Sequence, residues 1–162
     1  QGEFTDSIVK HINMVIENEA PISKHLLVKK MLKAYGISRN SIRLNAYFSN
    51  VFREMGLFSN DHGDTFFWKN EDQMHTFRIY RKASGREAYD IAPEEIANAA
   101  LQVLEEQFAM NEETLVRETA RLLGFANVRE NVSLSMKRGI TLGLSKRLFE
   151  MDGKRYRINN NG

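Results

Sequence analysis

The chain repeats itself at an interval of 88 residues. The match runs without a gap over residues 8–37 and includes the identical pairs Ile8 and Ile96, Val15 and Val103, Glu17 and Glu105, Leu27 and Leu115, Val28 and Val116, and Gly36 and Gly124. Past Gly36 it resumes if the second copy gains three residues, so that Leu57 falls on Leu148. Two copies are too few for a solenoid, so the repeat predicts two similar small domains.

The first copy predicts three helices followed by a β-hairpin. Apolar residues at helical spacing begin after Thr5 or Asp6 and stop at Pro21, and Ser23 is typical of the N-cap of a second helix. Gly36 is expected to end that helix in a left-handed conformation. A third helix is predicted from about residue 40 to residue 55, with an imperfect apolar face of Ile42, Ala46, Val51, Phe52 and Met55. Turn-forming residues 60–64 before the aromatic run 66–68 predict the hairpin.

The second copy predicts the same order of elements. Pro93 is typical of a first helical turn, with Glu94 and Glu95 complementing the helix dipole, and Asn111 is expected to open a second helix that ends at Gly124. The third helix and the hairpin are marked by Val132, Met136, Ile140 and Leu144, and by an Asp152-Gly153 turn between alternating flanks. Three helices followed by a two-stranded hairpin form the winged-helix arrangement. Two generic helical bundles with frayed tails are the alternative, but they leave both hairpins unexplained.

The predicted fold class is therefore mainly α with small β-hairpins (α+β), arranged as tandem winged-helix-turn-helix domains. The predicted domains are residues 5–70 and residues 91–160, joined by a basic linker over residues 71–90. Residues 1–4, Gln-Gly-Glu-Phe, are interpreted as a remnant of an expression vector and left out of the fold prediction.

Composition excludes several classes of protein. With 162 residues and 42% apolar residues, the chain has enough material for a buried core. The absence of cysteine excludes disulfide scaffolds and thiolate metal sites. No apolar run approaches the ~18 residues that a membrane helix needs, and no signal peptide is evident, so we expect a cytoplasmic protein without a membrane partner.

The formal net charge of +2 hides a strong segregation of charge along the chain. Residues 20–53 contain seven basic residues and no acidic one. In the second copy, residues 91–128 hold seven acidic residues against two basic ones, whereas residues 129–157 hold eight basic against three acidic. Basic side chains neutralise phosphates and release condensed counterions, so this segregation favours a polyanion partner. The alternative for the first copy is an ordinary solvated helix face.

The third helix and the hairpin are the elements by which a winged helix approaches DNA, so we expect each half to gather its cations there. The candidate nucleic-acid-binding residues are Lys29, Lys30, Lys33, Arg39, Asn40 and Arg43 in the first copy, Arg78 and Arg81 in the linker, and Arg129, Lys137, Arg138, Lys154, Arg155 and Arg157 in the second copy.

The linker permits two interpretations. Residues 76–81 alternate apolar and polar side chains like an edge strand, so Arg78, Arg81 and their basic neighbours are candidates to follow a phosphate chain while Tyr80 stacks on a base. The favoured alternative is that Phe77, Ile79 and Tyr80 dock on one of the two domains and leave the arginines solvated.

Catalytic motifs are nearly absent. The stretch Asp61-His62-Gly63-Asp64 contains metal-ligand residue types, but it is also what a tight hairpin turn requires. No phosphate-binding loop, nucleophile elbow or dinucleotide fingerprint occurs. We therefore expect no enzyme activity, no metal and no cofactor. A free-standing enzyme, which would need metal at the His62 loop, ranks third among the hypotheses.

Parts of both copies resemble a known family. Ile91-Ala92-Pro93-Glu94-Glu95-Ile96, Leu115-Val116-Arg117-Glu118 and Leu122-Leu123-Gly124-Phe125, with Ala20-Pro21-Ile22, Leu27-Val28 and Gly36 in the first copy, resemble a bacterial domain of unknown function. That domain is found at the C-terminal end of large superfamily-one helicase-like proteins that carry a nuclease-like domain related to very-short-patch repair endonucleases. The resemblance implies an accessory module of such a DNA-processing protein, with its helicase and nuclease domains as partners.

The function expected from the sequence is non-catalytic binding of DNA, either duplex or junction, through backbone contacts by a tandem winged-helix module. The alternative is a protein-interaction or structural module that docks on a motor or nuclease domain without contacting nucleic acid, since a fold does not determine its partner.

Overall fold

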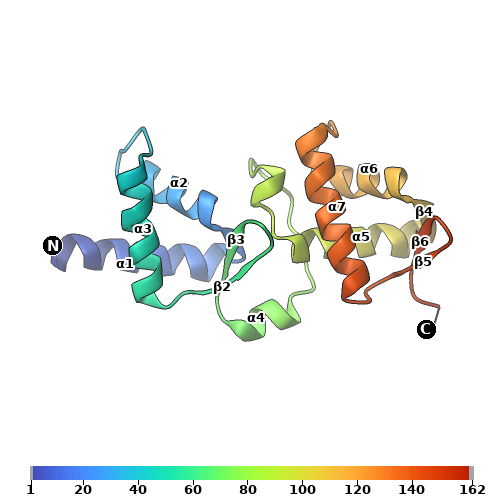
Figure 1. The fold of residues 1–162 in the computed structure, drawn as a ribbon, viewed down its shortest axis with the longest axis horizontal. Coiled ribbons are helices and arrows are strands. Elements are labelled where there is room, and N and C mark those ends of the chain that lie inside the picture. Colours follow the sequence, from blue (N-terminus) through green and yellow to red (C-terminus); the bar gives the residue numbers. More distant parts are fainter. Residues whose placement is uncertain (1, 161–162) are drawn as a thin grey trace. The chain divides into compact units, whose positions relative to one another are not determined.

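A computed structural model describes residues 2–160, which fold into two compact units with the division between residues 76 and 77. Unit 1 comprises the described residues up to 76, and unit 2 those from 77 onward. In Figure 1, unit 1 is coloured blue to green and unit 2 green to red. The protein contains both α-helices and antiparallel β-sheets, which confirms the predicted α+β class.

Unit 1 contains four helices and three short strands among its described residues. They are α1 (Gly2–Glu19), β1 (Ile22–Ser23), α2 (Lys24–Ala34), α3 (Ile42–Met55), β2 (Phe58–Asp61), β3 (Thr65–Trp68) and α4 (Glu71–Thr76). The strands form an antiparallel sheet of order β1-β3-β2, in which Phe67 faces both Ile22 and Ser59. Its core is built from the apolar faces of α1, α2 and α3 together with Ile22 and Phe67.

Unit 2 repeats this order after an additional N-terminal segment. The elements are the 3-10 helix η1 (Ala88–Asp90), α5 (Pro93–Gln107), β4 (Ala109–Asn111), α6 (Glu112–Leu123), α7 (Glu130–Ser145), β5 (Glu150–Asp152) and β6 (Arg155–Arg157). The sheet order is β4-β6-β5, equivalent to that of unit 1. Both predicted hairpins and all six predicted helices are present. The strands β1 and β4 are too short to show an alternating pattern in the sequence, and only the structure reveals them.

The helix ends follow the predicted signals. Ser23 Oγ accepts a hydrogen bond from the backbone N of Leu26 (2.9 Å), and Asn111 Oδ1 accepts one from the N of Thr114 (2.9 Å). Gly36 and Gly124 have φ of 70° and 100° after α2 and α6. Because both positions need a left-handed backbone, glycine recurs there in both copies.

The sequence match between the copies breaks after Gly36 and its counterpart Gly124, but the three extra residues of the second copy are not inserted there. α3 and α7 begin at equivalent positions of the repeat, and α7 has 16 residues against 14 in α3. The insertion therefore lies at the end of α7. As a result, Arg147 has a left-handed φ of 59° at the place where unit 1 has Gly56, with φ of 67°.

Three predictions about local structure are wrong. α1 begins at Gly2 rather than after Thr5 or Asp6, with Glu3 in its first turn, where a carboxylate favours the helix dipole. Residues 77–81 form no strand, because Asn98 Nδ2 of α5 binds the carbonyls of Phe77 (3.2 Å) and Ile79 (2.9 Å) that a strand partner would need. Ile42 and Ala46 are exposed, since the buried face of α3 consists of Phe48, Val51 and Phe52.

The predicted linker divides between the two units. Residues 71–76 form α4 of unit 1, where Gln73 Nε2 donates to the carbonyl of Ala20 (3.1 Å). Residues 77–90, here named the arm, belong to unit 2, and Ala83 and Ala88 lie in its core. Phe77 is buried and Tyr80 packs against that core, whereas Ile79 is exposed. Among the described residues, no helix has the length and apolar character that crossing a bilayer requires.

Candidate nucleic-acid interface

α2 presents two lysines of unit 1 to solvent on one face. Lys29 and Lys33 are four residues apart, so their side chains project from the same side of the helix, and both are exposed. Neither has an acidic partner among the described residues. Lys30, between them, instead forms an ion pair with Glu19 of α1 (Nζ to Oε1, 3.1 Å). Two of the three predicted lysines of α2 are therefore available to a ligand.

The start of α3 adds polar and cationic side chains. Ser41 caps the helix by accepting from the N of Leu44 (3.1 Å), and Asn40 Oδ1 accepts from the N of Ser41 (2.8 Å). Arg39 and Arg43, on either side of this cap, are exposed. Two exposed arginines therefore lie close in sequence to the N-terminus of α3, an end of a helix at which anions are favoured.

A groove of about 390 Å³ lies between α2 and the turn that leads to α3. It is lined by His25, Val28, Lys29, Leu32, Lys33, Ile37, Ser38 and Asn40. This lining contains two lysines and no carboxylate. The potential in the groove is therefore positive, which attracts an anionic ligand.

The hairpin of unit 1 does not share this charge. Its turn carries Asp61 and Asp64, and Gly63 N donates to Asp61 Oδ1 (2.8 Å). The expectation that each half gathers its cations on its last helix and hairpin is therefore wrong for unit 1. The predicted exposed cations of unit 1 lie on α2, on the α2–α3 turn and on α3, whereas the hairpin turn is acidic and is stabilised by Asp61.

In unit 2, the face of α6 that corresponds to the lysine face of α2 has its positive charge largely compensated. Arg117 and Arg121 occupy the positions of Lys29 and Lys33, but Glu118 stands where unit 1 has Lys30. Glu118 Oε2 lies 3.8 Å from Arg117 Nε and 3.4 Å from Arg121 Nη1. One carboxylate therefore lies near both arginines, whereas the equivalent Lys29 and Lys33 of α2 have no acidic partner among the described residues.

The equivalent groove of unit 2 has a volume of about 500 Å³ and, unlike the groove of unit 1, is lined in part by acidic residues. Glu112 and Glu113 lie on its α6 side, opposite Lys137 of α7. Glu112 Oε1 is 3.9 Å from Lys137 Nζ, and Glu112 Oε2 accepts a hydrogen bond from the hydroxyl of Tyr156 (3.2 Å). Burial, followed by the nearby Glu112 charge, raises the pKa of Tyr156 above its ordinary value. Lys137 is thus a weaker candidate than the lysines of α2.

The hairpin of unit 2 is rich in arginine, but much of that charge is internally compensated. Arg157 Nη2 pairs with Glu150 (2.8 Å) and its Nη1 with Asp152 (3.0 Å). Arg155 Nη2 donates to the carbonyl of Ala109 (3.1 Å). Lys154 at the turn and Arg129 before α7 are exposed, whereas Arg138 is partly buried. The predicted residues of unit 2 therefore form no continuous unpaired surface.

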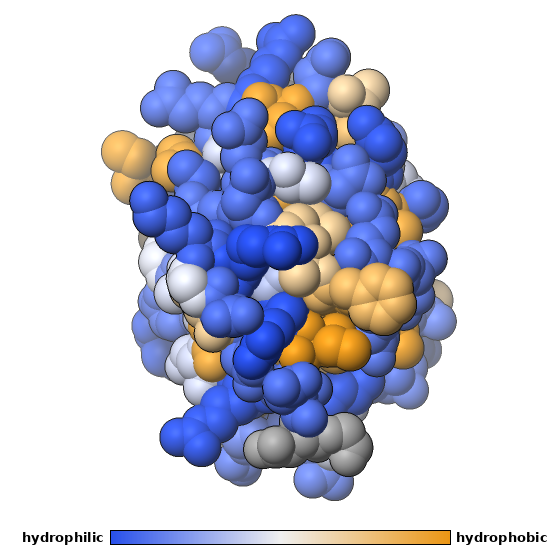
Figure 2. Space-filling model, turned by 90° about the vertical axis from the view of Figure 1, so that its right-hand side faces the viewer, coloured by the Kyte–Doolittle hydropathy of each residue, from blue (hydrophilic) through white to orange (hydrophobic). Residues whose placement is uncertain are grey.

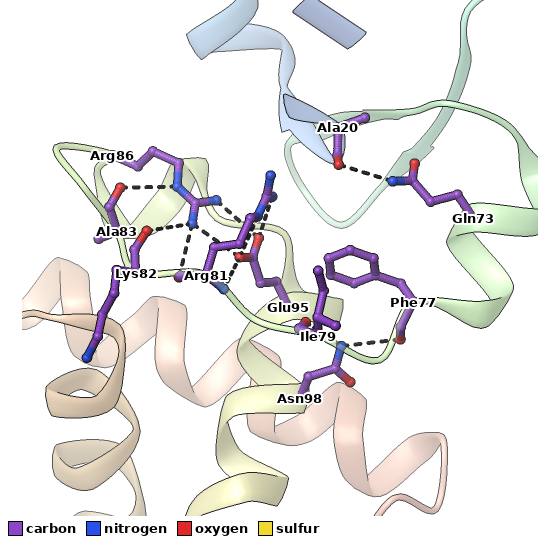
Figure 3. A network of polar contacts seen from close by, with 10 residues as sticks. All are labelled: Ala20, Gln73, Phe77, Ile79, Arg81, Lys82, Ala83, Arg86, Glu95 and Asn98. Atoms are coloured by element: carbon purple, nitrogen blue, oxygen red, sulfur yellow. Dashed lines mark hydrogen bonds and ion pairs between the residues drawn. The ribbon is translucent and has the colours of Figure 1, made fainter. Parts of the chain in front are cut away.

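The arm holds a buried charge cluster rather than a phosphate-binding strip (Figure 3). The side chain of Glu95 is fully buried, and five N–H groups donate to its carboxylate. Arg81 supplies its backbone N (2.7 Å), Nε (3.0 Å) and Nη2 (2.8 Å), and Arg86 supplies Nη1 (3.1 Å) and Nη2 (3.2 Å). Burial raises the pKa of Glu95, but the hydrogen bonds and charges of the two arginines outweigh it and hold the pKa below its ordinary value.

This cluster corrects one expectation: Arg81 is neither left solvated nor placed to bind a phosphate, because its guanidinium is paired with Glu95. Glu95 itself lies in the first turn of α5, as predicted. Lys82 of the arm also contacts the rest of unit 2, since its Nζ donates to the carbonyl of Leu122 (2.7 Å), whereas Arg78 Nη1 donates within the arm to the carbonyl of Phe77 (2.9 Å). The Glu95 cluster and the Lys82 contact therefore fix the arm on the rest of unit 2.

Sequence reasoning missed one residue in each unit that bears on the candidate interface, Ile42 in unit 1 and Glu118 in unit 2. The neutralising role of Glu118 was visible in the repeat, because an acid there replaces Lys30 of the first copy. The exposure of Ile42 was signalled only by the imperfect spacing of the apolar face of α3.

Comparisons with protein-family models, curated proteins and solved structures find no match for this chain. The resemblance to a helicase-associated domain therefore stays a prediction. Among the described residues, no group of three or more histidine and acidic side chains is arranged to hold a metal ion.

Proposed function

We propose that this chain is a tandem winged-helix module in which unit 1 binds DNA. Each unit has the order helix, strand, helix, helix, strand, strand, and its first strand pairs with its third. This order and pairing are typical of winged-helix domains, in which the second and third helices form a helix-turn-helix. In this assignment α3 enters the major groove, and α2 crosses the phosphate backbone.

The observation that carries the proposal is the unpaired charge of unit 1. Lys29, Lys33, Arg39 and Arg43 are exposed on α2, the turn and α3, with no acidic partner among the described residues. Phosphate neutralisation by such side chains releases counterions and supplies most of the affinity of non-specific DNA binding. Unit 2 supports the proposal by contrast, because Glu118 neutralises the equivalent face.

The module is proposed to be a non-catalytic accessory part of a larger DNA-processing protein. This role rests on the resemblance to the domain found in helicase-like proteins. The module would hold duplex or junction DNA by its backbone, while the helicase and nuclease domains of the parent chain carry out the chemistry.

The test is a titration of the whole chain against duplex DNA over a range of salt concentrations, followed by fluorescence anisotropy. Four phosphate contacts predict that log affinity falls against log salt with a slope of about −4. The double variant Lys29→Glu with Lys33→Glu is expected to abolish binding.

The matched control is Arg117→Glu with Arg121→Glu, the same charge change at the repeated positions of α6. It is expected to leave binding nearly unchanged, because these arginines are already compensated by Glu118. Absence of binding by the unaltered chain at low salt would refute the proposal, as would equal losses in the two double variants.

A second candidate function, docking on another protein, is favoured by one observation in unit 2. Phe108 at the end of α5 is 71% exposed although its φ of 71° is a strained conformation for a residue with a Cβ. Figure 2 shows hydrophobic residues gathered in a strip on one mostly hydrophilic face of the molecule. If Phe108→Gly disrupts assembly with the parent's other domains while Lys29→Glu with Lys33→Glu does not, docking is the primary function.

A further inference from the structure

An isoleucine stands at the beginning of α3, among the cations of unit 1. Ile42 is 92% exposed, and Ala46, one turn further along the same face, is exposed as well. Arg39 and Arg43 flank this position, and the chain has no acidic residue between Glu19 and Glu54. An apolar surface in a strongly positive environment suits a partner that offers both negative charge and an apolar group.

The neighbouring face of α3 carries an oriented amide. Asn45 lies three residues after Ile42, so the two side chains project from adjacent points of one helix face. Asn40 Nδ2 donates to Asn45 Oδ1 (3.3 Å), which fixes the direction of the Asn45 amide. Within the described contacts, the NH₂ group of Asn45 and a second lone pair on its oxygen remain for a ligand.

The major groove of DNA matches both features. An A·T pair presents there the C5-methyl group of thymine and the N7 acceptor and N6 donor of adenine. Apolar side chains contact the methyl group, and the amide of asparagine pairs with the adenine edge through two hydrogen bonds. A-form RNA helices do not admit side chains into their major groove, so these two features favour DNA.

We propose that Ile42 and Asn45 give unit 1 a preference for A·T pairs, with Ile42 contacting the thymine methyl group and Asn45 the adenine edge. This inference rests on the proposed binding of duplex DNA by unit 1. Unit 2 has Glu130 and Ser133 at the equivalent positions. A carboxylate there repels phosphates, so the preference belongs to unit 1 alone.

The test compares an alternating dA·dT duplex with the same duplex containing deoxyuridine in place of thymidine. The two differ only in the methyl group, so phosphate charge and hydrogen-bonding edges are unchanged. At fixed salt the whole chain is expected to bind the thymine duplex tighter, by about fourfold for each methyl group contacted. Ile42→Ala is expected to remove this difference and to keep the salt slope.

Two further variants separate the parts of the inference. Asn45→Ala is expected to lower the preference for dA·dT over dG·dC duplexes while the thymine-to-uracil difference remains. Leu134→Ala, which removes an apolar side chain that is 62% exposed on α7, is the matched control and should change neither comparison.

The outcomes distinguish this inference from the function on which it rests. Measurable, equal binding of the thymine and uracil duplexes overturns the inference and leaves DNA binding by unit 1 intact. Retention of the difference in Ile42→Ala overturns the role of Ile42. Failure to bind any duplex at low salt overturns both proposals.

Discussion

Replacing Glu95 with glutamine removes the carboxylate that joins the arm to α5. Glutamine has nearly the same shape, but it carries no charge and one of its two terminal groups is a donor. The amide therefore cannot accept all five N–H groups that now converge on Glu95. Arg81 and Arg86 are left without their counter-charge in a site where their side chains are only 32% and 15% exposed.

The size of the effect follows from this burial. Breaking a buried ion pair by removing one partner costs about 3–5 kcal/mol. The arginines retain some access to water, so the lower limit applies, and we expect Glu95→Gln to lower the free energy of unfolding of unit 2 by about 3 kcal/mol. For a unit of fewer than 100 residues this is a fall in Tm of about 12 °C or more.

Urea or thermal unfolding followed by two probes provides the assay. Far-ultraviolet circular dichroism reports the helices of both units, whereas the fluorescence of Trp68 reports unit 1. Glu95→Gln is expected to move the part of the dichroism transition that belongs to unit 2 and to leave the Trp68 transition in place. Glu105→Gln, at an exposed position of the same helix, is the control and should have little effect.

The contribution of Glu95 to the stability of unit 2 depends on pH in a definite direction. Because the folded-state pKa of Glu95 is lowered, its stabilising contribution is present above the ordinary glutamate pKa and is lost as the pH falls through the folded value. The difference in stability between the original chain and Glu95→Gln should therefore shrink in acid. A loss below about 1 kcal/mol at neutral pH would fall in the range of surface pairs and refute this account of the cluster.

The remaining predictions concern α6 and α7. Gly139→Ala should destabilise unit 2 by about 2 kcal/mol in urea unfolding, because a Cβ at this position overlaps the side chain of Ile96; an unchanged midpoint would contradict the close approach of α5 and α7. Arg147→Gly should raise the free energy of unfolding of unit 2 by about 1 kcal/mol in the same assay, because Arg147 has a left-handed backbone at the position where unit 1 has Gly56. Glu118→Lys should add DNA affinity and steepen the salt slope by about 1, because it recreates on α6 the arrangement of α2; an unchanged slope would argue against the charge contrast.

Much of the fold could be predicted from local signals. Capping residues such as Ser23 and Asn111, and glycines such as Gly36 and Gly124, act through their own backbone and nearest neighbours, so their effect is visible in the sequence. The 88-residue repeat extended these signals from one copy to the other. The very short β1 and β4 escaped prediction, because their pairing with the hairpins is set by contacts distant in sequence.

The candidate interface was less predictable, because it depends on which charges meet in space. The sequence suggested fourteen nucleic-acid-binding residues, but it does not show that Arg157 meets Glu150 and Asp152 or that Lys30 meets Glu19. Coulombic compensation acts over a few ångströms, and those distances exist only after folding.

The amino-acid sequence alone determined that the chain contains two copies of one pattern, three helices followed by a hairpin. Helix caps, turns and apolar periodicity are local properties and can therefore be recognised in the sequence. Tertiary structure decided that the arm belongs to unit 2, since the carboxylate of Glu95 is brought to Arg81 and Arg86 only when α5 and the arm pack together. It also decided which cations remain available, since Glu118 compensates its neighbours on α6 whereas Lys30 leaves those of α2 exposed. Position along the chain sets the charge of each segment, and packing sets whether that charge is paired or faces water.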